Sequence, residues 1–321
     1  MNGRTAGIWS KRLCALWLAL TTLFDAGTSV AARPTVAIVM SSGAGPFVEA
    51  ATVVQGVLRR SPLQPEILSF ELEGSESNVS AVLKLVRRAE PAVVITIGTI
   101  ATSSILAEPL DAPIVFSMVL YPEQSRFVGV PGREVTGASL DIPLDTQFAT
   151  LRRLLPKAKR LGVLYHPTET GRIVEDARSI APRHGFQLDA RTVNEPAAAE
   201  GAFGQLIGQV DALWTVADSH VFSPQSTSSL ILASIRSGVP MFGLSVSHVR
   251  SGAVAAISCD YADIGEQTAE LALRVLRGEK ASTIPPTVPR KTRFALNLKT
   301  AERLDLRPAQ ELIDEAVEVI R

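Results

Sequence analysis

Glycine and hydroxyl-bearing residues follow three of the short apolar runs in the first part of the chain. The loops begin at Ser41, Gly98 and Ser117, where these runs end. Glycine lets a ligand approach the backbone closely, and hydroxyl groups donate hydrogen bonds to carbonyl or carboxylate oxygens. This combination predicts a site that holds a small molecule by polar contacts. The expected contact residues are Ser42, Gly43, Phe47, Gly98, Thr99, Thr102, Ser117 and Tyr121.

A second group of polar residues follows apolar runs in the later part of the chain. Loops at residues 165–169, 217–220 and 245–247 carry the candidate contact residues His166, Asp218 and Ser245. The Asp218 carboxylate could accept a hydrogen bond from a ligand amino or hydroxyl group, or it could cap the next helix or hold its own loop. Three aromatic residues could form a wall of the site or fill the core: Phe47, Tyr121 and Trp214.

The motifs that activate a nucleophile or bind a phosphate or metal are missing from the sequence. Gly43 and Gly45 follow an apolar run, but the third glycine of a dinucleotide fingerprint is absent. No Gly-Lys-Ser/Thr loop, His-Glu-x-x-His helix, paired-cysteine spacing or Gly-x-Ser-x-Gly elbow occurs. His166 and His220 could share a metal in a cleft, although imidazoles on polar loops are more often solvated or hydrogen-bonded. We predict that the protein is not an enzyme and has no catalytic residue, metal or cofactor.

Short Val/Ile/Leu runs alternate with amphipathic stretches along the chain, which is typical of parallel sheets covered by helices on both faces. We expect the α/β class with two doubly wound parallel-sheet lobes. The predicted strands are residues 35–40, 65–70, 92–97, 113–117, 160–165, 187–193, 212–216, 241–244, 254–259 and 293–298. The predicted helices are residues 48–60, 78–89, 101–108, 144–155, 169–184, 197–210, 226–237, 263–277, 299–304 and 309–320.

The first 32 residues have the composition of a secretory signal peptide. Lys11 and Arg12 precede an apolar run of about a dozen residues, and small residues follow at 30–32. The run is shorter than the roughly 20 residues that span a bilayer, which argues against a permanent anchor. Asp25, between the run and the cleavage site, is irregular for a signal peptide, so an uncleaved N-terminal anchor is the alternative. We therefore expect the protein to be exported to the periplasm, with the cleavage site near residue 32.

Composition limits the partners of the exported chain. The whole chain carries 32 basic and 32 acidic residues without a cluster of like charge, so a nucleic-acid partner is not indicated. Cys259 is the only cysteine beyond the signal, so no internal disulfide can form. The remaining 289 residues exceed the usual size of one hydrophobic core, which favours two lobes.

The chain resembles the substrate-binding proteins of ATP-driven importers with the type I periplasmic-binding fold, in the branch that includes tryptophan- and tyrosine-binding members. The resemblance covers nearly all of the chain after the signal, in the expected order. It is carried by Pro113-Ile-Val-Phe-Ser117, Val135-Thr-Gly-Ala-Ser139, the run from Leu154 to Tyr165, Gly252-Ala253, Asp260-Tyr261, Ile264-Gly-Glu-Gln-Thr-Ala269, Leu276-Arg-Gly-Glu-Lys280 and residues 285–297.

The resemblance implies two lobes joined by three chain crossings, near residues 139–142, 258–261 and 286–292. The first lobe would comprise residues 33–140 and 260–288, and the second residues 141–259 and 289–321. A monomer of this kind would capture a small molecule such as an amino acid or aromatic solute between its lobes. It would then deliver the solute to the membrane permease of an ATP-driven importer.

The resemblance also assigns roles to particular residues. Asp218 stands where the family has an acidic residue after a strand, and Asp260 belongs to a matching segment and is a further candidate contact. One departure concerns the segment Gly243-Leu-Ser-Val-Ser247, where amino-acid-binding relatives have acidic residues after the glycine. A charged contact is missing there, so the sequence favours a less cationic small molecule over an amino acid.

Two other functions are compatible with the same sequence pattern. A binding module that presents its solute to a membrane kinase or chemoreceptor would have the same fold and signal. An exported hydrolase on a similar sheet would need an activated nucleophile or a metal, for which the sequence offers no residue set. A cytoplasmic repressor shares the fold, but the signal and the absence of DNA-binding helices oppose it.

Overall fold

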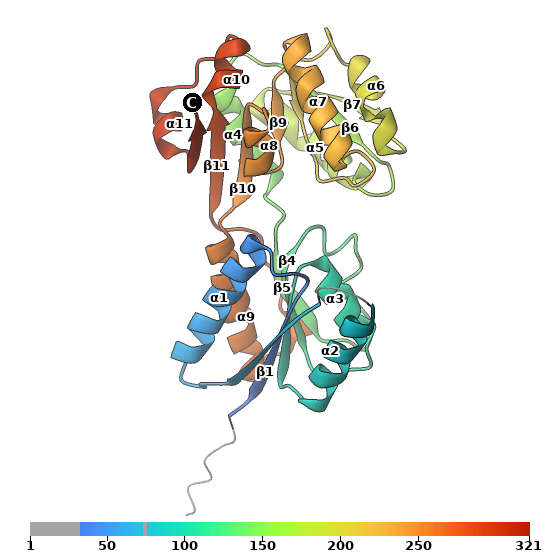
Figure 1. The fold of residues 1–321 in the computed structure, drawn as a ribbon, viewed down its shortest axis with the longest axis vertical. Coiled ribbons are helices and arrows are strands. Elements are labelled where there is room, and N and C mark those ends of the chain that lie inside the picture. Colours follow the sequence, from blue (N-terminus) through green and yellow to red (C-terminus); the bar gives the residue numbers. More distant parts are fainter. Residues whose placement is uncertain (1–32, 73–75) are drawn as a thin grey trace, which may run out of the picture. The chain divides into compact units, whose positions relative to one another are not determined.

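The computed structural model describes residues 33–72 and 76–321, so the predicted signal peptide lies outside the described residues. Residues Pro34–Arg321 belong to one unit, which contains two α/β lobes (Figure 1). In the part of the chain that is described, no helix has both the length and the apolar character of a membrane span.

The first lobe is built on a five-stranded sheet in which every pair of neighbours is parallel. The strand order is β2-β1-β3-β4-β5. Its elements are β1 Thr35–Met40, α1 Gly45–Arg60, β2 Glu66–Glu71, α2 Glu76–Arg88, β3 Val93–Ile97, α3 Thr99–Leu106, β4 Ile114–Val119, β5 Val135–Ser139 and, from later in the chain, α9 Tyr261–Leu276.

Burial on both faces of this sheet follows from the alternation of side chains along each strand. In β1, Val36 and Ile38 pack into one core together with residues of α1 and α9. Ala37 and Val39 point to the opposite core, which α2 and α3 help to close. All four side chains are fully buried, which explains why β1 is a continuous apolar run in the sequence.

Helix α9 packs beside α1 although about 200 residues separate them in sequence, and Figure 1 shows the two helices side by side. The contact is close at Gly265, where an added Cβ would lie 2.6 Å from the Ala50 carbonyl oxygen. The same helix is tied to the sheet by Thr268, whose hydroxyl donates to Ser117 Oγ at 2.8 Å. The late segment is therefore part of the first lobe's core.

The second lobe is built on a seven-stranded sheet with the order β12-β11-β10-β9-β8-β6-β7. All neighbours are parallel except β10 and β11, which are antiparallel. Its elements are α4 Leu144–Leu154, β6 Arg160–Tyr165, α5 Gly171–Ile180, η1 Ala181–His184, β7 Gln187–Thr192, η2 Pro196–Ala198, α6 Ala199–Gly204, β8 Ala212–Trp214, α7 Pro224–Ser237, β9 Met241–Gly243, α8 Val246–Arg250, β10 Ala255–Cys259, β11 Thr292–Asn297, α10 Leu298–Arg303, α11 Gln310–Glu315 and β12 Glu318–Ile320. The predicted fold class is confirmed.

The C-terminal segment differs from the prediction. The apolar spacing of residues 309–320 predicts one helix, whereas the structure has the short helix α11 followed by the strand β12. Strand β12 pairs with β11 in parallel, from Ala295 opposite Glu318 to Asn297 opposite Ile320. Without this pairing, one side of β11 would present unpaired backbone groups, and sheet formation at an open edge outweighs local helical spacing.

The chain passes between the lobes three times. It leaves the first sheet after β5, returns from β10 into α9, and crosses again between α9 and β11. Before the last crossing, the 3-10 turn η3 Ala281–Thr283 still packs on the first lobe. The chain then pairs with the end of β5, at a bridge between Ala138 and Thr287. Ile142, on the first crossing, packs against the main core of each lobe. The crossings therefore form a connected hinge.

Candidate functional site

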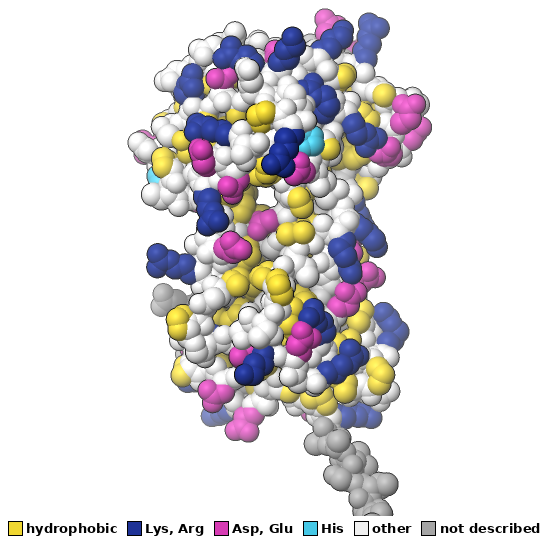
Figure 2. All heavy atoms as spheres, turned by 180° about the vertical axis from the view of Figure 1, so that it is seen from behind, with side chains coloured by type: hydrophobic (Ala, Val, Ile, Leu, Met, Phe, Trp, Pro, Cys, Tyr) yellow, Lys and Arg dark blue, Asp and Glu magenta, His cyan; other side chains and the backbone are white. Residues whose placement is uncertain are grey.

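A cavity of about 390 Å³ lies at the hinge and is lined by residues of both lobes. Figure 2 shows the surface hollowed between the lobes, with hydrophobic and acidic side chains around the hollow. The volume is in the range that holds a small organic molecule. The lining residues are Leu120, Tyr121, Gln124, Leu140, Asp141, Ile142, Pro143, Leu144, Gln147, Ile173, Asp176, Trp214, Thr215, Val216, Ala217, Phe242, Gly243, Leu244, Ile257, Ser258, Cys259, Tyr261 and Val288.

The position of this cavity follows from the sheets. Strands β4, β5, β8, β9 and β10 all end at it, and the chain segments that follow them supply most of its wall. In open parallel sheets the carboxyl ends of the strands form the crevice where ligands bind. The cavity is therefore where this architecture is expected to hold a ligand.

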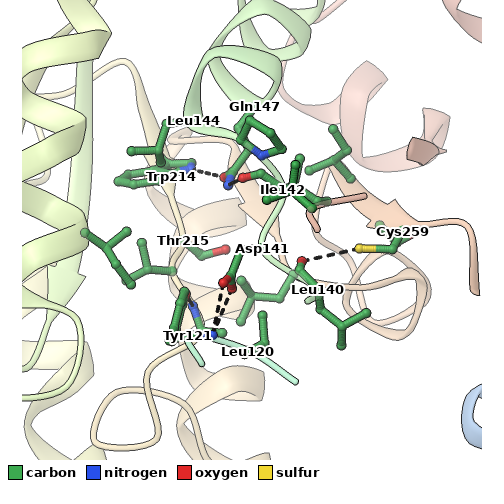
Figure 3. Close-up of a pocket in the computed structure, with 18 of the residues that line it drawn as sticks. Leu120, Tyr121, Leu140, Asp141, Ile142, Leu144, Gln147, Trp214, Thr215 and Cys259 are labelled. Atoms are coloured by element: carbon green, nitrogen blue, oxygen red, sulfur yellow. Dashed lines mark hydrogen bonds between the residues drawn. The ribbon is translucent and has the colours of Figure 1, made fainter. Parts of the chain in front are cut away.

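Trp214, at the end of β8, is held rigidly in the wall. Its side chain is 1% exposed, and its ring lies 5.1 Å from the ring of Phe148 between centroids. The indole Nε1–H donates to Gln147 Oε1 at 3.0 Å, and Gln147 Nε2 donates to the Ile142 carbonyl at 2.8 Å (Figure 3). These bonds connect the second sheet to the first hinge crossing through the cavity wall.

Tyr121 connects the two lobes across the cavity. It lies in the loop after β4, with a φ of 52°, and its hydroxyl accepts a hydrogen bond from the Ala217 N–H at 3.3 Å. Ala217 follows β8 in the other lobe. Burial, together with the nearby carboxylate of Asp141, raises the pKa of Tyr121 well above its usual value, so the hydroxyl stays protonated.

Asp141 is the carboxylate at the centre of the site. It lies on the first crossing, and the Tyr121 N–H donates to its Oδ1 at 2.9 Å and to its Oδ2 at 3.2 Å (Figure 3). Burial raises the pKa of Asp141 to about 6, and the Tyr121 bond offsets only part of that effect. The charged form is therefore less favourable here than in water.

Cys259 closes another part of the wall, at the end of β10. Its Sγ donates to the Leu140 carbonyl at 3.3 Å, and burial raises the pKa of the thiol to about 12. A thiol with so high a pKa carries almost no thiolate at neutral pH, so it is a poor nucleophile. Cys259 therefore packs the hinge rather than performing chemistry.

The cavity contains one of the twelve contact residues expected from the sequence, Tyr121. Two of the others, Thr102 and Ser117, are fully buried and bonded inside the first lobe. Thr102 Oγ1 lies 2.9 Å from Thr96 Oγ1 and donates to the Gly98 carbonyl, while Ser117 Oγ accepts from Thr268. Their hydroxyls therefore already have partners within the protein.

Five of the remaining predicted residues lie in the loops before α1 and α3 or in the first turns of these helices. Ser42 and Phe47 are partly buried, Gly43 and Thr99 are exposed, and Gly98 is buried. None of the five lines the cavity. Their contact with a solute stays a prediction. They follow β1 and β3, whereas the cavity's first-lobe residues follow β4 and β5 at the same edge of the sheet.

Gly98 adopts a φ of 91°, which only glycine takes without strain. An added Cβ would also lie 2.5 Å from Ser41 Oγ, the acceptor for the Ala101 N–H. We expect Gly98→Ala to lower the free energy of unfolding by about 2 kcal/mol, from backbone strain and overlap together. Urea titration measures this value.

Gly129→Ala is the matched control. Its φ is 72°, but no atom lies within 4 Å of the added Cβ. We expect only the strain, about 1 kcal/mol. Equal losses of unfolding free energy in the two variants would contradict the prediction that overlap with Ser41 adds to the cost of Gly98→Ala.

Asp218 holds the loop in which it lies. The side chain is fully buried, and its Oδ2 accepts from the His166 N–H at 2.7 Å and from the Thr170 hydroxyl, while its Oδ1 accepts from the His220 N–H at 2.9 Å. These bonds fasten the loop after β8 to the loop after β6. Asp218 does not line the cavity.

His166 and His220 stack with ring centroids 3.9 Å apart. Glu169 Oε2 lies 2.7 Å from His220 Nδ1, and Asp218 Oδ1 lies 3.8 Å from the same atom. Among the described residues, Glu169, Asp218 and His220 are the group that could hold a metal ion. Burial would raise the pKa of Glu169, but hydrogen bonds from Ser219 and His220 keep it below its usual value.

The last two predicted residues lie at helix starts. Asp260 caps α9, because its Oδ1 accepts from the Ala262 and Asp263 N–H groups, and its Oδ2 pairs with Arg293 Nη2 at 2.7 Å. The Ser245 hydroxyl, before α8, lies 2.8 Å from that of Ser247. Neither residue lines the cavity.

Sequence reasoning did not single out several residues that the structure brings to the cavity. Asp141, Gln147 and Thr215 were absent from the expected set, and Trp214 was expected either in a wall of the site or in the core. The position in the chain was the only available signal, because Asp141 lies within the predicted first crossing and Trp214 within the predicted strand 212–216. Gln147 carries no such signal, since it lies in helix α4, eight positions beyond the end of β5.

A sequence profile described as "ABC transporter substrate binding protein" matches residues 52–320. A tyrosine-binding protein from Clostridioides difficile (strain R20291) is 27% identical over 201 residues, which are 61% of this chain and 58% of that protein. The match therefore spans less than two thirds of that curated relative.

Two solved structures share the fold. One is an ABC domain from Streptococcus pneumonia in complex with L-Trp, with a TM-score of 0.66 and 22% identity over 90% of this chain and 100% of that one. The other is a ligand-free, open substrate-binding protein with adhesive properties from Clostridium difficile, with a TM-score of 0.74 and 20% identity over 89% of this chain and 99% of that one.

Proposed function

Because the chain belongs to the family of ABC transporter substrate-binding proteins, we propose that it captures a small aromatic solute in the hinge cavity and delivers it to the permease of an ATP-driven importer. The observation that carries this proposal is the cavity itself, which residues of both lobes line and whose wall includes the aromatic residues Trp214, Tyr121 and Tyr261. The family match confirms the sequence-based resemblance and the prediction of a solute-binding protein rather than an enzyme.

The proposal includes closure of the lobes on the solute. The first lobe would comprise residues 33–140 and 260–288, and the second residues 141–259 and 289–321, so that the three crossings bend. Ile142 contacts both cores, and the Tyr121–Ala217 hydrogen bond joins the lobes at the cavity. Bending changes the distance between the strand ends, so the loops around Ser42 and Thr99 could then approach the solute. The closed form is the state that a permease would recognise, and the cell compartment would be the periplasm.

The nature of the relatives favours an aromatic solute. One is a tyrosine-binding protein and another was solved in complex with L-Trp. In this chain, the indole of Trp214 and the ring of Tyr121 lie on different segments that meet at the cavity. An aromatic ring between such surfaces buries apolar area and gains from ring–ring contact.

We expect at least one solute with an indole or phenol ring to raise the melting temperature of the purified chain. A ligand at 100 times its Kd stabilises the folded state by about 2.7 kcal/mol, which is several degrees for a protein of this size. A thermal-shift screen of aromatic amino acids, aromatic amines, aromatic acids and nucleosides measures this, with sugars as non-aromatic controls. No shift across the library would contradict the proposed function.

A further inference from the structure

The cavity wall has an unusual balance of charge. Among the described residues that line it, two are carboxylates, Asp141 and Asp176, and none is lysine, arginine or histidine. An amino acid carries both an ammonium and a carboxylate, and a buried carboxylate needs a cation or several strong donors. The wall therefore offers a partner for the ammonium group but no cationic partner for the carboxylate.

Asp141 has no compensating cation of its own within the described structure. The groups that act on its charge are the Tyr121 N–H and the Ser139 hydroxyl, which stabilise it, and Glu123, which opposes it. Burial is the largest influence and raises the pKa of Asp141 to about 6. A cation placed in the cavity would relieve this cost, so Asp141 is suited to be a counter-ion.

Aromatic residues complete the site for such a cation. Trp214, Tyr121 and Tyr261 line the same cavity as Asp141. Figure 3 shows the Asp141 carboxylate between the first crossing and Thr215, with Trp214 on one side and Tyr121 on the other. Ring faces attract cations and also pack against an aromatic ligand.

We infer that the cavity recognises an aromatic amine that lacks a carboxylate, with Asp141 as the counter-ion of its ammonium group. This inference rests on the proposed function and narrows its solute class. It differs from the ligands that the relatives' names give, which are amino acids. It also differs from the sequence-based expectation of a less cationic solute. That expectation rested on the absence of an acidic residue after Gly243, whereas in this inference Asp141, on the first crossing, is the acidic contact.

The test compares ligands that differ only in the carboxylate: tryptamine with L-tryptophan, and tyramine with L-tyrosine. Isothermal titration calorimetry of the purified chain at pH 7.5 gives each Kd. We expect at least one amine to bind about 10-fold or more tightly than its amino acid, because the amino acid must bury a carboxylate beside that of Asp141. Tighter binding of both amino acids would overturn the inference and leave the proposed function standing. Failure of all four ligands, together with a silent thermal-shift screen, would overturn the proposed function.

Asp141→Asn tests the counter-ion directly. We expect the affinity for the better amine to fall about 10-fold or more, while the melting temperature of the ligand-free variant at pH 7.5 stays equal or rises, since a buried charge is removed. Asp145→Asn is the matched control, because it makes the same charge change on an exposed side chain of α4 outside the cavity. An unchanged affinity in Asp141→Asn, or equal losses in the two variants, would overturn the role of Asp141.

The pH dependence gives a second readout. A cationic ligand binds the charged carboxylate, so affinity should fall as pH decreases through about 6, and the fall should vanish in Asp141→Asn. Three titratable groups interact electrostatically with Asp141, namely Tyr121, Glu123 and Cys259. Asp176 and Tyr261 are the other titratable side chains that line the cavity. The same pH dependence in the variant would overturn the assignment to Asp141.

Discussion

Asp218→Ala is expected to lower the free energy of unfolding by about 4 kcal/mol. The substitution removes a fully buried carboxylate that accepts from the His166 N–H, the Thr170 hydroxyl and the His220 N–H. Each hydrogen bond to a charged group contributes about 1.5–3 kcal/mol. The three donor groups would also lose their acceptor while remaining partly buried, which adds to the loss. Urea unfolding followed by circular dichroism measures the loss.

The same variant separates two roles of Asp218. If the residue only fastens the loops after β6 and β8, the folded fraction of Asp218→Ala should still bind the solute identified by the thermal-shift screen with a Kd changed only a few-fold. Asp218→Asn is the control, because one side-chain oxygen remains as an acceptor and we expect about half of the loss. A large loss of affinity with unchanged stability would instead make Asp218 a ligand contact.

Trp214→Ala is the second substitution with a large expected effect, about 4 kcal/mol. The side chain is 1% exposed and packs against Phe148, and truncation of a buried tryptophan leaves a void that the fold only partly fills. Solute affinity should fall as well, because the variant loses an aromatic wall of the cavity. Circular dichroism in urea gives the stability, and calorimetry gives the affinity.

Trp214→Phe distinguishes packing from hydrogen bonding. The phenyl ring keeps most of the contact with Phe148 but cannot donate to Gln147 Oε1. We expect a loss of about 1 kcal/mol, the usual net value of one neutral hydrogen bond, plus a small cavity. A loss as large as that of Trp214→Ala would show that the bond to Gln147, rather than the ring, dominates.

The strands could be predicted from the sequence where both of their faces are buried. The predicted bounds 35–40 and 160–165 coincide with β1 and β6, because continuous apolar runs between turn residues have few alternative structures. Segments whose structure depends on a distant partner were less predictable. Residues 309–320 have helical spacing, yet their end forms β12 because β11 needs a neighbour.

Short elements were also missed for local reasons. The predicted helix 197–210 is interrupted, since α6 ends at Gly204 and residues 205–208 are turns. The predicted helix 169–184 divides into α5 and a 3-10 turn at Ala181, where Pro182 cannot continue the hydrogen bonding of an α-helix. Strand β5 was not predicted, although its residues were among those that carry the resemblance, because Thr136, Gly137 and Ser139 hide its buried character.

The site was less predictable than the fold. Hydroxyl groups such as those of Thr102 and Ser117 indicate polar chemistry at strand ends, but sequence alone does not show that Thr96 and Thr268 already pair with them. Asp141, in contrast, lines the cavity but was not predicted, because a single acidic residue in a hinge belongs to no recognisable motif. Its burial arises only when the segments around Tyr121 and Asp141 meet the segment around Cys259, which lies more than 100 residues later in the chain.

The packing of α9 beside α1 has a consequence for how the chain acquires its structure. Helix α9 lies after nearly all of the second lobe in sequence, yet it covers one face of the first sheet. A nascent chain that ends before residue 261 therefore leaves apolar side chains of α1 and β1 exposed to water. Closing a loop of about 200 residues is expected to be slower than forming local contacts, because the loop-closure entropy is lost before the contacts between α1 and α9 are gained. We therefore expect the core of the N-terminal lobe to form late, after α9 has been synthesised. Until then its exposed apolar surface would make the chain prone to aggregation and a substrate for chaperones.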